Sequence, residues 1–359
     1  SYTIEVYRGQ QRPERHLGRF ALYVAFFPQL VAGPIERAPR LLPQLKERVV
    51  FDYDRVADGV KLMFWGLFQK AVIADRLASF VEPVYNQPEH HGGLMLTMAT
   101  VFFAFQIYCD FAGYTHIAMG AAQVFGIRLM ENFRRPYFAG SIADFWRRWH
   151  ISLSSWFRDY VYVPLGGNRV AASRWCVNIL AVFVLSGIWH GAHWTFGAWG
   201  LLHATYMLLG RALKPMRRRV GRVLGVERLP RLTHGMGVAA TFALVCFGWV
   251  LFRAHDLRDA SHIVTHWFRN WNVPTTWKGF LDLGPTLNME PHFFAKEMAL
   301  SVGLVAFLVC IDALGCKESM RVRMARWPVW ARFAAYSVGL WFFFLFGVFR
   351  QKEFIYFTF

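Results

Sequence analysis

The sequence predicts an all-α polytopic membrane protein, and three features of its composition support this class. Of its 359 residues, 55% are hydrophobic and 18% are aromatic, while only 18% carry a charge. Mean hydropathy is +0.26, which is too apolar for an ordinary soluble enzyme. A helix needs about 20 mostly apolar residues to cross a bilayer, and several windows of the sequence reach or approach that length. We therefore expect a chain that lies in the lipid bilayer and crosses it more than once.

The net charge of +17 is explained by membrane topology. Arg and Lys residues cluster between the apolar windows, as the positive-inside rule predicts for cytoplasmic loops. No nucleic-acid recognition motif accompanies them, so we expect no nucleic-acid partner. The five cysteines show neither paired spacing nor a CxxC motif, and the sequence therefore predicts no disulfide or zinc framework.

The first third of the chain alternates apolar and charged stretches. Residues 17–35 form an apolar run that ends in a Gly-Pro pair, which should terminate a helix. Residues 36–55 are predicted as a loop or an interfacial helix. Residues 56–80 are predicted as a helix that either is buried among others or lies partly at the interface. Residues 94–127 are long enough for one full span with a broken continuation.

The window 94–127 also holds polar groups, among them Asp110 and His116 in the run QIYCDFAGYTHIAMG. Ionisable groups are costly at membrane depth and often functional, so these residues are one candidate lining of a polar pocket. The alternative is helix packing through small residues, with Asp110 paired to a cation from elsewhere in the chain. The sequence leaves both interpretations open.

Residues 131–169 mix basic and aromatic side chains, a composition typical of a membrane interface. Asp144 is expected to cap or lead a helix that carries Trp146, Arg147 and His150, which would place His150 against a tryptophan-rich surface. A turn is predicted in the following run PLGGN. The alternative is a solvated amphipathic anchor with no part in chemistry.

The stretch 186–203, SGIWHGAHWTFGAWGLLH, places three histidines in an apolar, glycine-rich run. If the stretch is helical, His190 and His193 lie three residues apart near one face, and His203 continues the run. A single histidine in such a run is more often a satisfied core residue. Three histidines in one apolar window favour a functional site.

The charge pattern orders the remaining elements. Eight basic residues between Arg211 and Arg231 predict a cytoplasmic loop. Residues 234–252 are predicted as a span, followed by a mixed polar and aromatic loop at 253–296. A second span is predicted at 298–315, a basic loop at 317–332 and a final span at 333–349.

Among the three histidines, His190 is the first candidate for a general base. Transfer of an acyl group to a hydroxyl needs a base that is neutral near pH 7, and imidazole meets this need. Gly191 leaves one side of His190 without a bulky neighbour. The sequence has no GxSxG nucleophile elbow, which favours direct transfer from an activated acyl donor over a serine hydrolase.

Two other patterns carry less weight. His190 and His193 could together ligate a metal, but the sequence lacks HExxH and a nearby carboxylate, so no metal site is predicted. His255 and Asp259 form an HxxxD string, which chance explains better than catalysis.

Six runs spread over nearly the whole chain carry a family resemblance. They are FFPQLVAGPIER, QIYCDFAGYTHIAMG, NFRRPY, DFWRRWHISLSSWFRDYVYVPLGGNR, SGIWHGAHWTFGAWGLLH and EFIYFTF. Together they resemble the membrane-bound O-acyltransferase family, and within it the alginate O-acetyltransferase branch. The resemblance implies that His190 is the catalytic residue and that His150 is a second functional histidine. It also implies a ring of transmembrane and interfacial helices around a central tunnel, where a cytoplasmic donor meets an extracytoplasmic acceptor.

The resemblance also bears on the extent of the chain. The family begins with several membrane helices that precede these runs, and the first residue here is Ser1. We therefore expect an N-terminally truncated fragment whose residues 1–359 form a single membrane domain.

The function that the resemblance implies is O-acyl transfer in the cell inner membrane. Acetyl would move from a cytoplasmic donor, acetyl-CoA, towards an exported polysaccharide such as alginate. The acceptor would be a periplasmic acetyl-accepting protein or the polysaccharide itself, and no bound cofactor is expected. Substrate-binding or supporting roles are expected for Trp189, His193, Asp144, Arg147 and Asp110.

Two alternatives to acetyl transfer stay open. A related branch of the family performs D-alanyl transfer to teichoic acid from a carrier protein. A lipid or polymer transporter would instead use the histidines as protonation sites and would form no acyl product.

Overall fold

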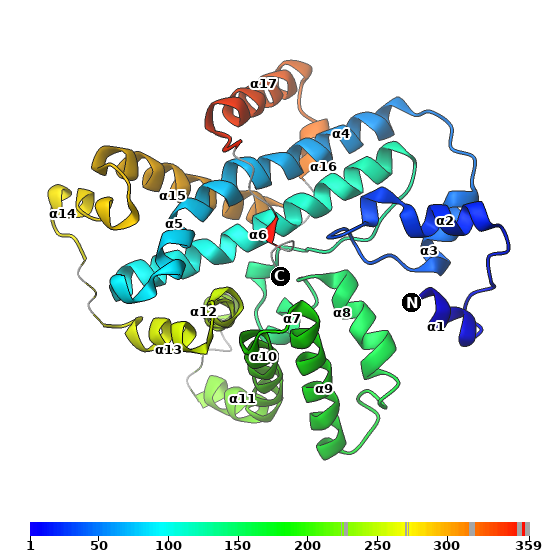
Figure 1. Cartoon of the computed structure of the whole chain (residues 1–359), viewed down its shortest axis with the longest axis horizontal. Coiled ribbons are helices and arrows are strands. Elements are labelled where there is room, and N and C mark those ends of the chain that lie inside the picture. The colour runs from blue at the N-terminus through cyan, green and yellow to red at the C-terminus, as the bar shows by residue number, and fades with distance from the viewer. Residues whose placement is uncertain are drawn as a thin grey trace. The chain divides into compact units, whose positions relative to one another are not determined.

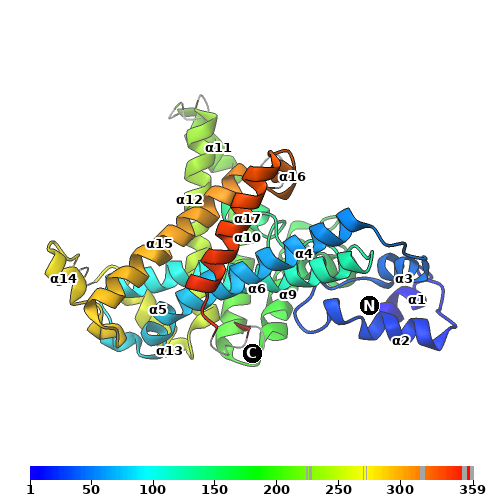
Figure 2. The ribbon, with the colours of Figure 1, turned by 90° about the horizontal axis from the view of Figure 1, so that it is seen from above.

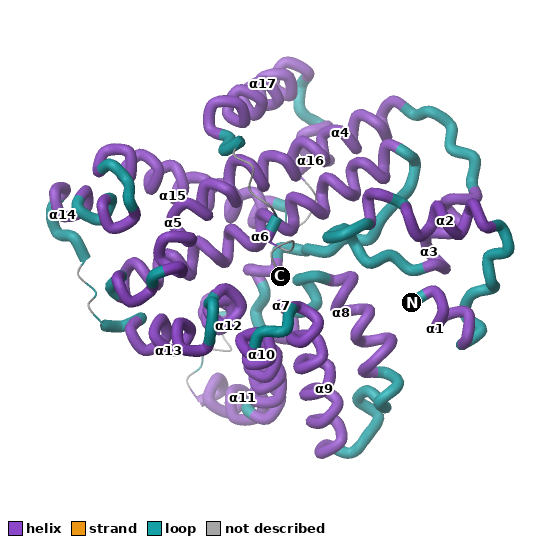
Figure 3. The backbone as a smooth tube through the Cα atoms, in the orientation of Figure 1, coloured by secondary structure: helices purple, strands orange, loops and turns teal. Residues whose placement is uncertain are grey.

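The computed structural model describes residues 1–223, 225, 229–269, 271, 273–315, 320–349 and 354–355, without the side chains of residues 320–322. Every regular element in this part of the chain is a helix, and no strand occurs in it (Figure 3). The all-α prediction is confirmed. Most of the run EFIYFTF and the start of the predicted basic loop at 317–332 lie outside the described residues.

Helices of membrane-spanning length occur in several parts of the chain. Within the described residues, five helices are long and apolar enough to cross a bilayer: α6 (Gly93–Val124), α9 (Ala172–His190), α12 (Pro230–Arg253), α15 (Pro291–Leu314) and α17 (Val329–Phe346). The last three coincide with spans predicted from the charge pattern. By length and composition, the chain is a multi-pass membrane protein.

The described residues group into two compact units. The first takes its residues from 1–75, 107–132 and 309–358, and the second takes them from 76–106 and 133–308. Helix α6 contributes its first part to the second unit and its remainder to the first. A single membrane domain over residues 1–359 stays a prediction.

The first unit contains short helices near the N-terminus together with the longer helices α4 (Tyr53–Phe68) and α17. Its further elements are α1 (Tyr2–Tyr7), α2 (Leu17–Ala25), η1 (Phe27–Gln29), α3 (Ala38–Lys46), the π-helical η2 (Gln69–Ala74) and α16 (Met320–Ala325). Helix α4 begins at a side-chain cap, because the Asp52 carboxylate accepts the N–H of Arg55 at 2.8 Å.

Helix α6 runs unbroken from Gly93 to Val124, so the predicted break within residues 94–127 is wrong. Its glycines serve close packing instead of a bend. A methyl group on Gly113 would lie 2.7 Å from the carbonyl oxygen of Gly66 in α4. Small residues allow two helix backbones to approach in this way, and α4 runs alongside α6 in both views (Figure 1, Figure 2).

The second unit holds most of the remaining helices. They are α5 (Asp75–Asn86), α7 (Ile142–Phe145), α8 (Ile151–Phe157), α10 (Trp194–Ala212), α11 (Lys214–Val223), α13 (Leu257–His266) and α14 (Trp277–Leu281), with the short η3 (Pro88–His90), η4 (Pro136–Phe138), η5 (Arg158–Tyr162) and η7 (Pro285–Leu287). The predicted loops at 211–231 and 253–296 therefore contain helices. Arg and Lys favour helix in α11. Asp256 caps α13 by accepting two backbone N–H groups.

Helices α9 and α10 form a tightly packed hairpin (Figure 1). A methyl group on Gly187 in α9 would collide with the carbonyl oxygen of Phe196 in α10. A methyl group on Gly200 in α10 would collide with the carbonyl oxygen of Phe183 in α9. This close approach fixes the end of the hairpin, where His190 lies.

Candidate functional site

His190 and His193 lie on opposite sides of a helix break. His190 is the last residue of α9, and His193 is the N-cap of α10. The stretch 186–203 is therefore two helices and a turn, and the expectation that both histidines lie on one helical face is wrong. The hairpin forces this break at Gly191, where a methyl group would lie 2.5 Å from the Phe196 ring. His190 is 8% exposed, whereas His193 is exposed.

Aromatic rings from three helices surround His190. Its ring centroid lies 4.9 Å from that of Trp189 in α9, 5.2 Å from that of Trp199 in α10 and 5.3 Å from that of Phe252 in α12. Each of these rings meets the imidazole edge to face, with interplanar angles between 76° and 87°. The imidazole is thus held in one orientation in an apolar pocket.

His150 reaches the same pocket from another part of the chain. Its ring centroid lies 6.2 Å from that of Trp189, so the rings of His150 and His190 both pack on Trp189. His150 is 3% exposed. Burial, together with the electrostatic effect of His190, holds the pKa of His150 well below its ordinary value. The structure therefore brings together two histidines that are forty residues apart in the sequence.

The backbone at His150 is unusual and corrects a prediction. Helix α7 ends at Phe145, so Trp146, Arg147 and His150 do not share a helix led by Asp144. His150 is the N-cap of α8 in the left-handed region, with φ 42° and ψ 56°. A non-glycine residue held there carries conformational strain, which surrounding packing must maintain. This backbone conformation directs the chain from the Trp149 core contact into α8.

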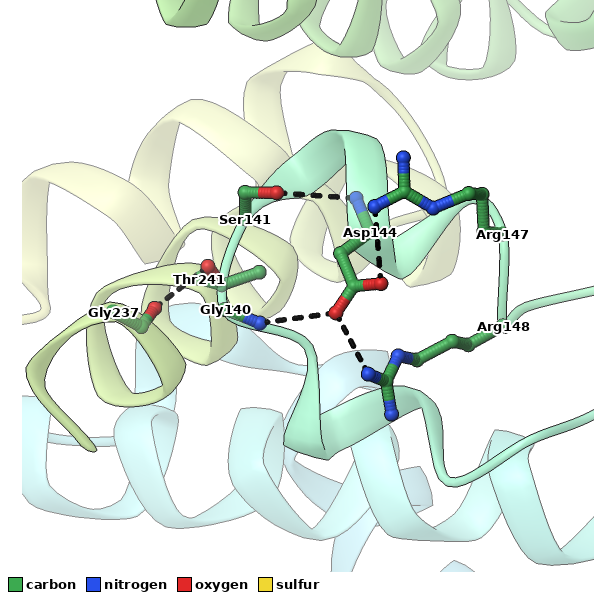
Figure 4. Close-up of polar contacts among 7 residues, drawn as sticks. All are labelled: Gly140, Ser141, Asp144, Arg147, Arg148, Gly237 and Thr241. Atoms are coloured by element: carbon green, nitrogen blue, oxygen red, sulfur yellow. Dashed lines mark hydrogen bonds and ion pairs between the residues drawn. The ribbon is translucent and has the colours of Figure 1, made fainter. Parts of the chain in front are cut away.

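Asp144 anchors the segment that leads to His150 (Figure 4). Its Oδ2 accepts the Gly140 N–H at 3.3 Å and contacts Arg148 Nη2 at 2.9 Å. Its Oδ1 accepts from Arg147 Nη2 at 3.2 Å. Partial burial alone would raise the pKa of the Asp144 carboxyl, but Arg148 and Arg147 hold that pKa below its ordinary value. Ser141, not Asp144, is the N-cap of α7.

A third buried histidine, His203, packs beside this pocket. Trp146 Nε1 donates to Nδ1 of His203 at 3.3 Å, and His203 packs against Trp199 with ring centroids 5.0 Å apart. No pattern in the sequence marks Trp199, Phe252 or Arg148 as a site residue. Trp199 lies in the histidine stretch and could have been included on that ground, whereas the place of Phe252 depends on how α12 packs.

Asp110 belongs to the first unit, whereas His150 and His190 belong to the second. Its Oδ1 contacts Lys70 Nζ at 2.6 Å, and the same ammonium contacts Asp75 Oδ1 at 2.9 Å. Its Oδ2 accepts the backbone N–H of Ile355 at 2.9 Å. The cation that the sequence could not identify is therefore Lys70. A role of Asp110 at the histidine site stays a prediction.

His193 lines a surface groove of about 270 Å³ between the start of α10 and the start of α13. The groove is lined by His193, Trp194, Thr195, His255, Asp256, Leu257 and Arg258. Trp194 is 83% exposed. The groove therefore offers an aromatic surface and polar side chains beside the hairpin turn that follows His190.

The helices and the paired histidines define a multi-pass membrane protein with a buried imidazole site. Residues 12–223 match the model of the membrane-bound O-acyltransferase family. The chain belongs to this family.

Individual relatives support the same placement. A probable alginate O-acetylase of Azotobacter vinelandii is 40% identical over 257 residues, which are 72% of this chain and 49% of that protein. The peptidoglycan O-acetyltransferase of Helicobacter pylori is 38% identical over 251 residues, 69% of this chain and 46% of that protein. The teichoic acid D-alanyltransferase of Bacillus subtilis is 30% identical over 266 residues, 69% of this chain and 64% of that protein. The chain spans about half the length of the first two relatives.

Proposed function

We propose that this chain carries the reaction site of an O-acetyltransferase of the cell inner membrane. The observation that carries the proposal is the burial of His150 and His190 against one tryptophan, Trp189, in an aromatic pocket. Relatives that are named alginate O-acetylase and peptidoglycan O-acetyltransferase support acetyl as the group transferred. The proposed donor is acetyl-CoA from the cytoplasm.

In the proposed reaction, His190 is the general base. Its imidazole takes the proton of the acceptor hydroxyl while that oxygen attacks the carbonyl carbon of the donor thioester. The bond between this carbon and sulfur then breaks, and the leaving thiolate receives the proton from the imidazolium. An acetyl ester remains on the acceptor and a free thiol leaves. His150, neutral near pH 7 because its pKa is lowered, assists by orienting His190.

The aromatic walls have a role in this proposal. Trp189, Trp199 and Phe252 offer no group that could compete with the hydroxyl for the acyl carbon. Burial of His190 among these rings would also limit hydrolysis of the thioester.

The acceptor would approach from the side opposite the cytoplasm. Helix α9 is long enough to span the membrane, and the turn between α9 and α10 lies at the end of this hairpin opposite the basic segment 211–231. The positive-inside rule places that basic segment in the cytoplasm. The groove beside His193 and Trp194 then faces the periplasm, where an acetyl-accepting protein or a polysaccharide such as alginate would bind. A ring of helices around a tunnel between donor and acceptor is part of this proposal.

D-alanyl transfer is the second candidate. The 30% identity to a teichoic acid D-alanyltransferase favours it, because the same histidine chemistry suits an aminoacyl thioester on a carrier protein. Purified full-length protein given acetyl-CoA or a D-alanyl carrier protein in parallel separates the two candidates by which acyl group appears on the acceptor.

The test of the catalytic assignment is His190→Ala in the full-length protein. We expect acetylation of the exported polymer to be lost while the protein level is retained. His292→Ala, at an exposed histidine at the start of α15, is the matched control and should acetylate normally. Polymer acetylation that persists in His190→Ala would remove the assignment. Transport that depends on His190 without any acyl product would favour the transporter alternative.

A further inference from the structure

Two arginines share one carboxylate on the segment that leads to His150 (Figure 4). The guanidinium groups of Arg147 and Arg148 contact different oxygens of Asp144, at 3.2 Å and 2.9 Å. The Arg147 side chain is 71% exposed and that of Arg148 is 29% exposed. Two positive charges against one negative charge leave an excess positive charge at this place.

The backbone around the pair is well fixed. The Gly140 N–H donates to Asp144 Oδ2 at 3.3 Å, and Ser141 Oγ accepts the N–H of Asp144 at 3.2 Å. The N–H of Arg134 donates to the carbonyl oxygen of Arg148 at 2.9 Å, which brings a third, exposed arginine alongside. Because the carboxylate restrains both guanidinium groups, binding an anion there loses less side-chain entropy than binding to free arginines.

Contacts along α12 relate this arginine pair to the histidine pocket. Gly140 packs against Gly237, about two turns into α12 from its start beside the basic segment 211–231. Trp149 packs on Trp249 with ring centroids 4.9 Å apart. His190 packs on Phe252 at the far end of α12.

These contacts show how the segment 140–150 runs along α12. The fifteen helical steps from Gly237 to Phe252 correspond to about 22 Å of helix. The segment 140–150 therefore runs from the cytoplasmic part of α12 towards the level of His190, with the arginine pair on the way. Asp144 accepts the N–H of Gly140, which packs against Gly237, so the arginine pair lies nearer the Gly237 end of this interval and His190 lies at its Phe252 end. This arrangement suits a ligand with a phosphate group at one end and a reactive thioester at the other, such as a nucleotide joined to an extended pantetheine arm.

The chemistry of the pair also selects phosphate. Each guanidinium has five N–H donors in a planar fork, and the contacts to Asp144 use one nitrogen of each. Phosphate oxygens accept such donors with charge assistance and in bidentate geometry. A solvated interfacial anchor would not need two arginines restrained by one shared, partly buried carboxylate.

The geometry points to Arg147 and Arg148 as the binding site for the phosphate groups of the acyl donor, held in place by Asp144. This inference rests on the proposed function, because it takes the donor to be a coenzyme A thioester. Arg147 and Arg148 bind the donor, Asp144 positions them, and His190 is left to the chemistry.

The test measures binding of coenzyme A itself to the detergent-solubilised full-length protein. We expect Arg147→Gln to weaken coenzyme A binding by about ten- to a hundredfold, because hydrogen bonds between charged groups are lost. Pantetheine, which lacks the phosphates, should bind wild type and Arg147→Gln equally. Arg218→Gln, at an exposed arginine of α11, is the matched control and should bind coenzyme A like wild type. An unchanged thermal midpoint for Arg147→Gln excludes misfolding as the cause.

Other results would overturn the inference. Equal coenzyme A affinity in wild type and Arg147→Gln would do so, as would no binding by wild type or an equal loss for pantetheine. A loss in Arg147→Gln only of phosphatidylglycerol binding from mixed detergent micelles, with coenzyme A binding intact, would show that the anion is a lipid headgroup. The proposed function has a separate test, because acetyl transfer that survives in His190→Ala would refute it. The coenzyme A measurements would still decide whether Arg147 and Arg148 bind the donor.

Discussion

A methyl group on Gly248 in α12 would lie 2.9 Å from Nε2 of His203 in α10. His203 has little room to withdraw, because Trp146 Nε1 donates to its Nδ1 and its ring stacks on that of Phe183 at 6.3 Å. Glycine at 248 therefore allows α12 to approach α10 at the level of His203. Trp199, which packs on both His203 and His190, links this contact to the proposed reaction site.

Gly248→Ala should destabilise the protein by overpacking. We expect a loss of about 1–3 kcal/mol, visible as a lower thermal midpoint in detergent, together with reduced acetyl transfer because Trp199 shifts against His190. Gly235→Ala in the same helix is the control, since no atom lies within 4 Å of a methyl group there. Equal thermal midpoints for the two variants would contradict this packing argument.

The lowered pKa of His150 predicts how stability depends on pH. The folded state keeps this imidazole neutral at pH values where the unfolded chain, with an ordinary pKa of 6.5, takes up a proton. The unfolded state thus binds more protons below pH 6.5, so stability is full above that pH and falls as the pH drops, by up to about 1.4 kcal/mol per pH unit from this group.

The measurement is the thermal midpoint between pH 7.5 and pH 5.5. Wild type should lose more stability over this interval than His150→Asn, which has no imidazole at this position to protonate. His292→Ala, which removes an exposed histidine, should behave like wild type. If His150→Asn and wild type decline in parallel, burial of a neutral His150 is not the source of the pH dependence.

The Asn178 side chain in α9 stabilises the turn that follows η5. Its Nδ2 donates to the carbonyl oxygens of Leu165 at 3.1 Å and Gly167 at 3.2 Å, so one buried side chain holds the turn that the run PLGGN predicted. Asn178→Leu should leave both acceptors without this donor and destabilise by about 1–3 kcal/mol. Limited proteolysis within residues 163–169 should become faster. Thr205→Val, which removes an exposed hydroxyl in α10, should not change it.

Local sequence patterns predicted which segments are long and apolar enough to span the membrane better than they predicted where the helices begin and end. The apolar windows predicted the spans α12, α15 and α17, because length and composition alone determine whether a helix can cross a bilayer. The spacing of His190 and His193 fits one helical face only if the stretch 186–203 is a single helix, which it is not. The break at Gly191 could not be predicted, since it follows from the packing of Phe196 across the hairpin.

The same limit applies to the candidate site. The family resemblance selected His150 and His190, and the structure places both rings against Trp189. Phe252 could not be chosen, because its contact with His190 depends on the packing of α12. Arg148 was passed over in favour of its neighbour Arg147, although both contact Asp144. Such side-chain contacts depend on tertiary packing, which no periodicity in the sequence records.

Lys70 is the cation of a buried cluster of charges in the first unit, and substituting it tests how much that cluster contributes to stability. Its ammonium contacts the carboxylates of Asp110 and Asp75, whose side chains are 2% and 8% exposed. Lys70→Met removes the positive charge that both buried carboxylates contact, and we expect a loss of about 3–5 kcal/mol in stability. The double variant Lys70→Met with Asp110→Asn should recover part of this loss, because one buried negative charge goes with the positive one.

Thermal midpoints of the wild type, the two single variants and the double variant form a double-mutant cycle. A coupling free energy of about 0.5–3 kcal/mol between Lys70 and Asp110 is expected for groups in direct contact. Lys61→Met, at an exposed lysine of α4, is the control and should change stability little. If the two single-variant effects simply add, Asp110 and Lys70 do not depend on each other. The contact would then not explain why Asp110 lies in an apolar helix.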